Sequence, residues 1–192
     1  MYGSAYITAH YLSSKHPQIQ KVRVVGMDSI CDELSRVGIE CVGGEQEQIQ
    51  HQNIDDFFAM EVDCTIGAVV VGLDTKFTYK KLAMAALQIQ SGKAKFFATN
   101  DDAYDMVGGK RSPGAGAMVT AIQCSLSSTD GQSHLPLVIG KPNPFAWELI
   151  KKDHNLKNCK ALMLGDRMDT DILFGFQAGI DTCLVMSGCT EN

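Results

Sequence analysis

Apolar runs of strand length alternate with helical segments along this chain, and this alternation restricts the fold more than any other feature of the sequence. Lys21–Val25 (KVRVV), Ala68–Val71 (AVVV) and Lys95–Ala98 (KFFA) are short runs of β-branched or aromatic character. Residues 29–38 and 78–89 carry the spacing or the end signals of helices. Strands separated by helices are typical of α/β proteins with a parallel sheet, and this is the predicted fold class.

A second series of elements follows residues 127–133 (SSTDGQS), which have the composition of a linker. Strands are expected at 137–139, 161–164 and 182–185, and helices at 144–154 and 170–178. Two or three parallel strands with two helices cannot cover both faces of a sheet. We therefore expect a boundary at residue 133 and, beyond it, an incomplete sheet with an open apolar edge.

The charge balance argues against nucleic acid and membrane as partners. Lys and Arg total 17 against 22 Asp and Glu, so the net charge is -5, and no basic cluster suited to a phosphate backbone is present. Apolar stretches such as Ala68–Val71 are far shorter than the roughly 20 residues that cross a bilayer. Met1 is followed by a mixed polar segment without the pattern of a signal peptide, so we expect a cytoplasmic protein.

Seven cysteines are scattered along the chain without a CxxC pair. This odd number and spacing disfavour a structural zinc site and an oxidised framework. The prediction is therefore a set of reduced, mostly buried thiols.

The segment 161–172 (ALMLGDRMDTDI) places carboxylates at the end of a predicted strand. Asp166 follows the strand directly, at the edge where parallel sheets bind ligands, and its oxygens suit Mg²⁺. Asp171 lies five residues later and would support Asp166 or a metal-bound water. The alternative is that Asp169 or Thr170 caps the following helix and the remaining residues lie on the surface.

Two further loops contribute candidate residues. Lys141, in the sequence LVIGKPNPF, follows a predicted strand in a loop stiffened by prolines, where its ammonium can neutralise a phosphate; Asn143 of this loop is a candidate substrate contact. Tyr104 and Asp105 lie in a predicted loop over 100–116 and are candidate polar contacts for a ligand. The alternatives are a solvated loop charge for Lys141 and a polar surface loop for the other pair.

Taken with their surroundings, these motifs resemble the haloacid dehalogenase (HAD) superfamily of aspartate-nucleophile phosphatases. GKPNP around Lys141 and GDRMDTDI around Asp166 are similar to the third and fourth motifs of that superfamily. SAYITAHYL, VVVGLDTKFTYKKL, ATNDD and SPGAGAMV are similar to the branch that contains 4-nitrophenylphosphatase, phosphoglycolate phosphatase and pyridoxal phosphatase. The resemblance covers essentially the whole chain.

The resemblance implies a domain division and a chemistry. Residues 1–14 would be a linker helix from the core, 15–133 a large α/β cap, and 134–192 the C-terminal half of a Rossmann-like core. The activity implied is that of a Mg²⁺-dependent phosphomonoesterase acting on a small phosphorylated metabolite. Lys141 would stabilise the phosphoryl charge, Asp166 would bind Mg²⁺ with Asp171 in support, and the cap would lower its loop over the substrate. A homodimer through the cap is also expected.

One departure from the family pattern is as informative as the match. Such enzymes carry their nucleophile in an N-terminal DxDx(T/V) motif, which this sequence lacks. Asp74 follows the run VVVGL but has no second carboxylate two residues on, so it is interpreted as a cap residue. We therefore expect a phosphatase truncated at both ends and inactive by itself. The alternative is a non-catalytic binding or dimerisation module with a vestigial half-core.

Overall fold

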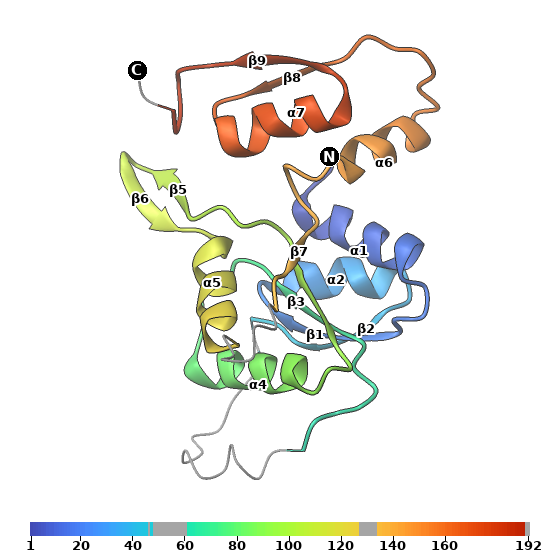
Figure 1. Cartoon of the computed structure of the whole chain (residues 1–192), viewed down its shortest axis with the longest axis vertical. Helices are drawn as coiled ribbons and strands as arrows, with labels where there is room; N and C mark the ends of the chain where they lie inside the picture. Colours follow the sequence, from blue (N-terminus) through green and yellow to red (C-terminus); the bar gives the residue numbers. More distant parts are fainter. Residues whose placement is uncertain (46, 48–60, 127–133, 191–192) are drawn as a thin grey trace.

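The main structural element is a five-stranded parallel sheet. The computed structural model describes residues 1–45, 47, 61–126 and 134–190. The strand order is β2-β1-β3-β4-β7, and every neighbouring pair is parallel (Figure 1). The strands are β1 (Lys21–Val25), β2 (Glu40–Gly43), β3 (Ala68–Val71), β4 (Lys95–Ala98) and β7 (Leu137–Val138). The predicted fold class is thus confirmed, with three of the strands at their expected positions.

Helices cover both faces of this sheet, which explains why its central strand is apolar throughout. One face packs against α1 (Ser4–Lys15), α2 (Asp28–Arg36) and α6 (Phe145–Asp153), and the other against α4 (Tyr79–Gln90) and α5 (Ala115–Ser125). In β3, Ala68 and Val70 face the first group, whereas Val69 and Val71 face the second. This alternation follows from the two-residue period of a strand. All four residues of β3 are buried.

The second part of the chain forms a separate pair of strands. β8 (Leu162–Gly165) and β9 (Asp181–Leu184) are parallel, and η1 (Met168–Ile172, a π-helix) and α7 (Leu173–Ala178) connect them. Figure 1 shows this layer stacked beyond α1 and α6, at the far end of the molecule from α4. Leu162 and Leu164 are each 60% exposed, and Phe176 is 80% exposed. The open apolar edge predicted for this part is present in the described residues.

The strand β7 connects the two parts. It follows residue 133 in sequence, yet Phe97 and Ala98 of β4 pair with Leu137 and Val138 of β7. Ile139, next in the chain, is fully buried against the first group of helices. The linker residues 127–133 lie outside the described residues, and the domain limits 1–14, 15–133 and 134–192 stay predictions.

A β-hairpin stands where the sequence suggested a loop. β5 (Tyr104–Val107) and β6 (Lys110–Pro113) pair in antiparallel fashion, and Gly108 and Gly109 form the turn with φ of +58° and +76°. Two positive φ angles suit a two-residue hairpin turn, and glycine reaches them without strain. The prediction of an irregular segment over 100–116 is therefore wrong in this stretch. Because β5 and β6 are exposed, their sequences lack the alternation of buried apolar and exposed polar residues that predicts a strand.

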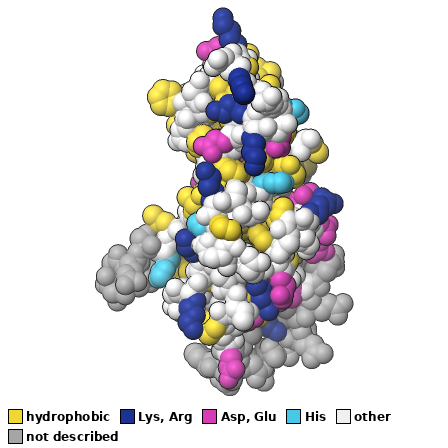
Figure 2. All heavy atoms as spheres, turned by 90° about the vertical axis from the view of Figure 1, so that its right-hand side faces the viewer, with side chains coloured by type: hydrophobic (Ala, Val, Ile, Leu, Met, Phe, Trp, Pro, Cys, Tyr) yellow, Lys and Arg dark blue, Asp and Glu magenta, His cyan; other side chains and the backbone are white. Residues whose placement is uncertain are grey.

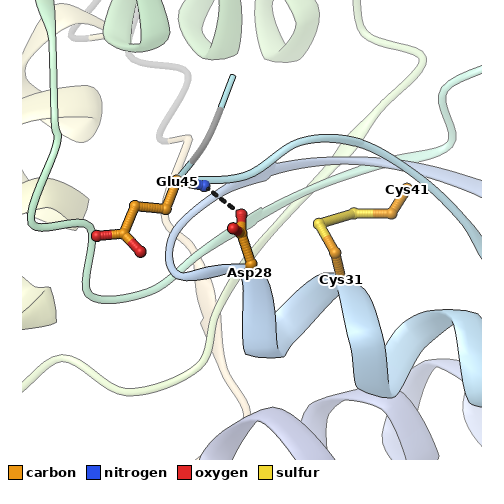
Figure 3. Close-up of a disulfide and its surroundings, with 4 residues drawn as sticks. All are labelled: Asp28, Cys31, Cys41 and Glu45. Carbon is orange, nitrogen blue, oxygen red and sulfur yellow. Dashed lines mark hydrogen bonds between the residues drawn. A yellow bond between two sulfur atoms is a disulfide. The ribbon is translucent and has the colours of Figure 1, made fainter. Parts of the chain in front are cut away.

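The cysteine prediction is also wrong. Cys31 of α2 and Cys41 of β2 form a disulfide, with their Cα atoms 5.5 Å apart (Figure 3). Gly38, with φ of +81°, ends α2 and lets the chain return alongside it as β2, which brings the two cysteines together. Beside them, Asp28 Oδ1 accepts a hydrogen bond from the Glu45 amide at 2.9 Å. The remaining thiols are not buried: four are exposed, and Cys189 is half-buried.

The surface agrees with the charge balance of the sequence. On the face drawn in Figure 2, basic and acidic side chains are interspersed, and hydrophobic side chains reach the surface between them. Among the described residues, no helix combines the length and the apolar character needed to cross a membrane.

Candidate active site

The loop after β7 and the π-helix η1, which follows β8, meet in one ion pair. The Lys141 ammonium donates a hydrogen bond to Asp171 Oδ1 across 30 residues of sequence. Asp171 is buried, whereas the side chain of Lys141 keeps 46% of its surface exposed. The lysine is thus anchored at its tip by a buried carboxylate and open to solvent along the rest of its length. The structure brings together the two motifs that the sequence singled out.

Asp171 also fixes the loop that carries Asp166. Its second oxygen, Oδ2, accepts hydrogen bonds from the amides of Asp166 at 3.1 Å and Arg167 at 3.2 Å. A Cβ atom at Gly165 would come within 2.2 Å of Asp171 Cβ, so glycine is required where the strand turns into this loop. Asp171 is therefore a support for the Asp166 loop and a partner for Lys141 at once.

Asp166 is held from the opposite side by the C-terminal segment. Its Oδ2 accepts the Cys189 amide at 2.7 Å, and its carbonyl accepts the Thr190 hydroxyl at 2.6 Å. Gly188 is needed here, because a Cβ atom there would lie 1.8 Å from Asp166 Oδ2. The Cys189 amide lowers the pKa of Asp166 below its usual value, so the carboxylate is charged at neutral pH. A charged carboxylate is the form that binds a cation.

Asn143 is placed differently from the other candidates. Its side-chain nitrogen donates to the Val138 carbonyl at 3.2 Å, and its Oδ1 accepts the Phe145 amide at 3.0 Å. Both ends of the amide thus bind the backbone around Lys141 and the start of α6. Asn143 holds the shape of the lysine loop, and its contact with substrate stays a prediction.

The β5–β6 hairpin brings its first residues to the Asp166 loop. The Tyr104 carbonyl accepts a hydrogen bond from Arg167 Nη1 at 2.9 Å, while Asp105 is exposed. Asp102, just before the hairpin, lies with Oδ1 3.7 Å from Arg167 Nε. Burial raises the pKa of Asp102 against the opposing effect of Arg167. The sequence placed Asp102 in the same loop as Tyr104 and Asp105 but gave it no role, because its carboxylate is one of several in that stretch.

Asp74 has a structural environment, as the sequence argument expected. Its carboxylate forms an ion pair with Lys81 at 2.7 Å, and the two side chains are 0% and 1% exposed, respectively. A carboxylate sealed in this way has no access to a phosphorus atom. Asp74 is a structural residue of the five-stranded sheet unit.

The described residues do not complete a site for Mg²⁺. No group of three or more His, Cys, Asp or Glu side chains with the proximity needed for a metal occurs in the part of the chain that the structure describes. Asp171 is taken up by Lys141 and two amides, which leaves Asp166 as the candidate ligand. Mg²⁺ takes one or two protein carboxylates in an octahedral shell, so further ligands would have to come from elsewhere.

Comparison with known proteins agrees with this geometry. Residues 138–192 match the family model described as HAD-hydrolase-like. Over its whole length the chain is 36% identical to phosphoglycolate phosphatase 1A (chloroplastic) of Arabidopsis thaliana, of which it covers 52%. It is 34% identical to 4-nitrophenylphosphatase of Schizosaccharomyces pombe, of which it covers 64%. The chain is thus similar to phosphatases along its whole length, and its residues 138–192 match a HAD-like model.

The chain is also similar to solved structures of phosphatases. A glycerol phosphate phosphatase of Mycobacterium tuberculosis, in complex with magnesium, matches 97% of this chain with a TM-score of 0.76 and 29% identity. The structure named Bs-TpNPPase matches with a TM-score of 0.75 and 30% identity. The chain covers 49% of the first structure and 65% of the second. It thus spans about half to two thirds of the length of these two structures.

Proposed function

We propose that this chain is part of a Mg²⁺-dependent phosphomonoesterase that acts on a small phosphorylated metabolite. The observation that carries the proposal is the ion pair between Lys141, in the loop after β7, and Asp171 of η1, beside the charged Asp166. The similarity to phosphatases along the whole chain supports the same reaction class.

Each residue of this cluster has a definite part in the proposed reaction. Lys141 places a positive charge where a transferring phosphoryl group would gain negative charge, which lowers the barrier to transfer. Asp166 would contribute one carboxylate to Mg²⁺, whose chemistry when bound is to neutralise phosphate charge. Asp171 holds the amides of Asp166 and Arg167 and so keeps both groups in place. Tyr104 and Asp105 would meet the leaving group from the hairpin.

The nucleophile in this proposal is an aspartate outside the chain. Its carboxylate attacks phosphorus and displaces the alcohol of the substrate, and water then hydrolyses the resulting aspartyl-phosphate to inorganic phosphate. The described carboxylates Asp74 and Asp171 are each taken up by a lysine, and this supports the assignment to a residue elsewhere.

Partners and compartment follow as further proposals. We expect a small phosphorylated metabolite as substrate, neither nucleic acid nor membrane as partner, and a homodimer through the cap. The net charge of -5 and the interspersed charges on the face drawn in Figure 2 support the expectation for nucleic acid. A cytoplasmic location is part of the proposal: four exposed free thiols suit a reducing compartment, whereas the Cys31–Cys41 disulfide is more typical of an oxidising one.

Hydrolysis of 4-nitrophenyl phosphate with Mg²⁺ tests the proposal. The chain of 192 residues should show no turnover, because Lys141 and Asp166 assist a nucleophile that it lacks. In the complete protein, Lys141→Ala should reduce kcat by about 10²- to 10³-fold, the usual loss when one charge-stabilising group is removed. Turnover by the chain alone that disappears in Asp166→Ala would show that the nucleophile lies within it.

The alternative is a non-catalytic binding or dimerisation module, and one observation favours it: Leu162, Leu164 and Phe176 are exposed apolar side chains, which suit contact with a partner. The sequence encoded upstream of Met1 separates the two functions. A strand that ends in DxDx(T/V) supports the enzyme, whereas a true start at Met1 supports the module.

A further inference from the structure

Arg167 connects three segments that are far apart in the sequence. Its Nη1 atom donates to the Tyr104 carbonyl at 2.9 Å and lies 3.6 Å from Cys189 Sγ. Its Nε atom lies 3.7 Å from Asp102 Oδ1. The guanidinium is therefore shared between the start of the β5–β6 hairpin and the C-terminal segment that binds Asp166.

The backbone of Arg167 is fixed at the candidate site. Arg167 directly follows Asp166, and its amide donates to Asp171 Oδ2 at 3.2 Å. The same Asp171 holds Lys141 through its other oxygen. A side chain that starts from this rigid loop transmits the position of the loop to whatever its guanidinium binds.

The hairpin has few other contacts that would hold it in place. All residues of β6 and three of the four residues of β5 are exposed. Backbone bonds from Gly114 to Ala103 and from Gly116 to Asp102 anchor its base to the start of α5. Beyond the base, the guanidiniums of Arg111 and Arg167 lie 4.5 Å and 5.3 Å from the centre of the Tyr104 ring. Arg111 belongs to the hairpin itself, so Arg167 is the one of this pair that reaches it from another part of the fold.

The contact between Arg167 and Asp102 is partly shielded from water, which strengthens the attraction between the two charges. The side chains of Arg167 and Asp102 are 14% and 25% exposed. Asp102 Oδ1 is buried and accepts no hydrogen bond within the described residues, so the charge of Arg167 is its compensation. A buried carboxylate without a neighbouring cation raises the free energy of the folded state. The arrangement therefore favours the docked hairpin over a detached one.

We propose that Arg167 is a positioning residue that docks the β5–β6 hairpin onto the loop of Asp166. Docking keeps Tyr104 and Asp105 at a fixed position relative to Lys141. Docking itself requires only the contacts given above. Its consequence for substrate binding rests on the proposed function. With the hairpin docked, the residues that would face a leaving group keep a fixed distance from the residues that would face the phosphate.

Hydrogen exchange in the chain of 192 residues tests docking without any need for activity. Arg167→Ala should raise the exchange rates of amides in 104–112 by at least about tenfold, the change that corresponds to roughly 1.4 kcal/mol. Amides of α4 should be unaffected. Arg167→Lys keeps the charge but loses the forked donor, so it should restore part of the protection. Asp102→Asn should loosen the same amides and serves as the test where Arg167→Ala does not fold.

The matched control is Arg111→Ala, which removes a cation from the same Tyr104 ring without touching the Asp166 loop. It should change exchange in 104–112 by less than about threefold, since cation–π contacts at exposed sites are weak. Equal effects of Arg111→Ala and Arg167→Ala, or no effect of Arg167→Ala on a folded chain, would overturn the docking role.

A kinetic split in the complete protein tests the consequence for substrate. Arg167→Ala should raise KM more than it lowers kcat, because Lys141 and Asp166 remain while the hairpin contacts are loosened. A loss confined to kcat would contradict positioning of the substrate by the hairpin. If exchange reports docking and the complete wild-type protein hydrolyses no phosphate ester, the proposed function fails and the docking inference stands.

Discussion

Lys81 and Asp74 form an ion pair that is almost completely removed from solvent, directly after the central strand β3. Asp74 Oδ1 also accepts the Lys76 amide at 2.8 Å, and Lys81 Nζ donates to the Glu45 carbonyl at 3.3 Å. These bonds tie the loop after β3 to α4 and to the end of β2. Desolvation of two charges offsets much of their attraction, so the pair contributes more to the arrangement of these loops than to net stability.

Removal of one partner should therefore be far more damaging than removal of both. Lys81→Met should lower the free energy of unfolding by about 3–5 kcal/mol, because it leaves Asp74 buried without a cation. The double variant Asp74→Asn/Lys81→Met should lose less than the single one, since no charge remains buried. Urea denaturation monitored by circular dichroism measures both. A loss below about 1 kcal/mol for Lys81→Met would show that the buried charge is compensated in another way.

The contacts of Asp63 lead to a prediction about how stability depends on pH. Its Oδ1 accepts the Thr65 hydroxyl at 2.5 Å and the Thr65 amide at 2.8 Å, and Lys21 Nζ lies 3.0 Å from Oδ2. The Thr65 hydroxyl, the Thr65 amide and then Lys21 lower the pKa of Asp63 from 3.8 to about 2. Because the folded pKa is the lower one, the charged form stabilises the fold at and above pH 3.8, and this contribution is lost as the pH falls toward 2.

The stability difference between the wild type and Asp63→Asn should therefore be largest near neutral pH and shrink as the pH falls below 3.8. Carbon-detected NMR of the Asp63 carboxyl checks the cause directly, because the group should still be ionised at about pH 3. The matched control is Asp153→Asn, at an aspartate on the far side of the five-stranded sheet. A carboxyl that titrates near 3.8 would contradict stabilisation of the charged Asp63 by the Thr65 hydroxyl, the Thr65 amide and Lys21.

At the scale of elements, the sequence predicted what depends on local patterns. Strands β1, β3 and β4 were found because buried parallel strands need continuous β-branched or aromatic runs. The hairpin was missed because β5 and β6 are exposed, and Gly108–Gly109 was its one local signal. Helical period likewise placed α4, whose N-cap Thr78 accepts the Lys81 amide.

Contacts that depend on chain reversal or on long separation were not predictable in this way. The Cys31–Cys41 bond requires the turn at Gly38, and the spacing of the cysteines alone does not reveal it. At the site, Lys141 and Asp171 were found because each follows a predicted strand. The expectation that the two strands share one sheet was wrong, because β7 belongs to the five-stranded sheet and β8 to a separate pair. The contact of Arg167 with Tyr104 spans 63 residues and connects segments of two separate sheets, so no local sequence pattern predicts it.

The disulfide gives a prediction for the α2–β2 unit. A bond between residues ten apart in sequence restricts the unfolded chain, and loop-closure entropy alone gives about 2–3 kcal/mol for such a short loop. Reduction with dithiothreitol, or Cys31→Ser with Cys41→Ser, should lower the free energy of unfolding by that amount. Calorimetric unfolding with and without reductant measures it. The matched control is Cys159→Ser, which should leave the melting temperature unchanged because that thiol is exposed and free.

At the scale of the whole molecule, the two parts differ in how completely they bury their strands. Every residue of β3 is buried between two layers of helices, whereas β8 alternates between exposed and half-buried positions. Figure 1 shows α7 on one side of β8 and β9 and no element of the described chain on the other. Burial of apolar area is the main favourable contribution to folding, so the second part has the smaller share of it.

Hydrogen exchange should report this difference as lower protection of residues 161–185 than of residues 68–98 in a dilute monomer. β8 and β9 pair only with each other among the described strands, and Leu162 and Leu164 lie 60% exposed. Local opening there breaks few contacts, whereas opening of β3 requires disruption of the whole sheet.

Unpaired strand edges and exposed leucines also favour binding of a partner strand, and a second copy of this chain can supply one. Protection of 161–185 that rises with protein concentration, together with a dimer by sedimentation, would identify such pairing. Equal and strong protection of both parts at high dilution would mean instead that β8, β9 and α7 are stable without any partner sheet.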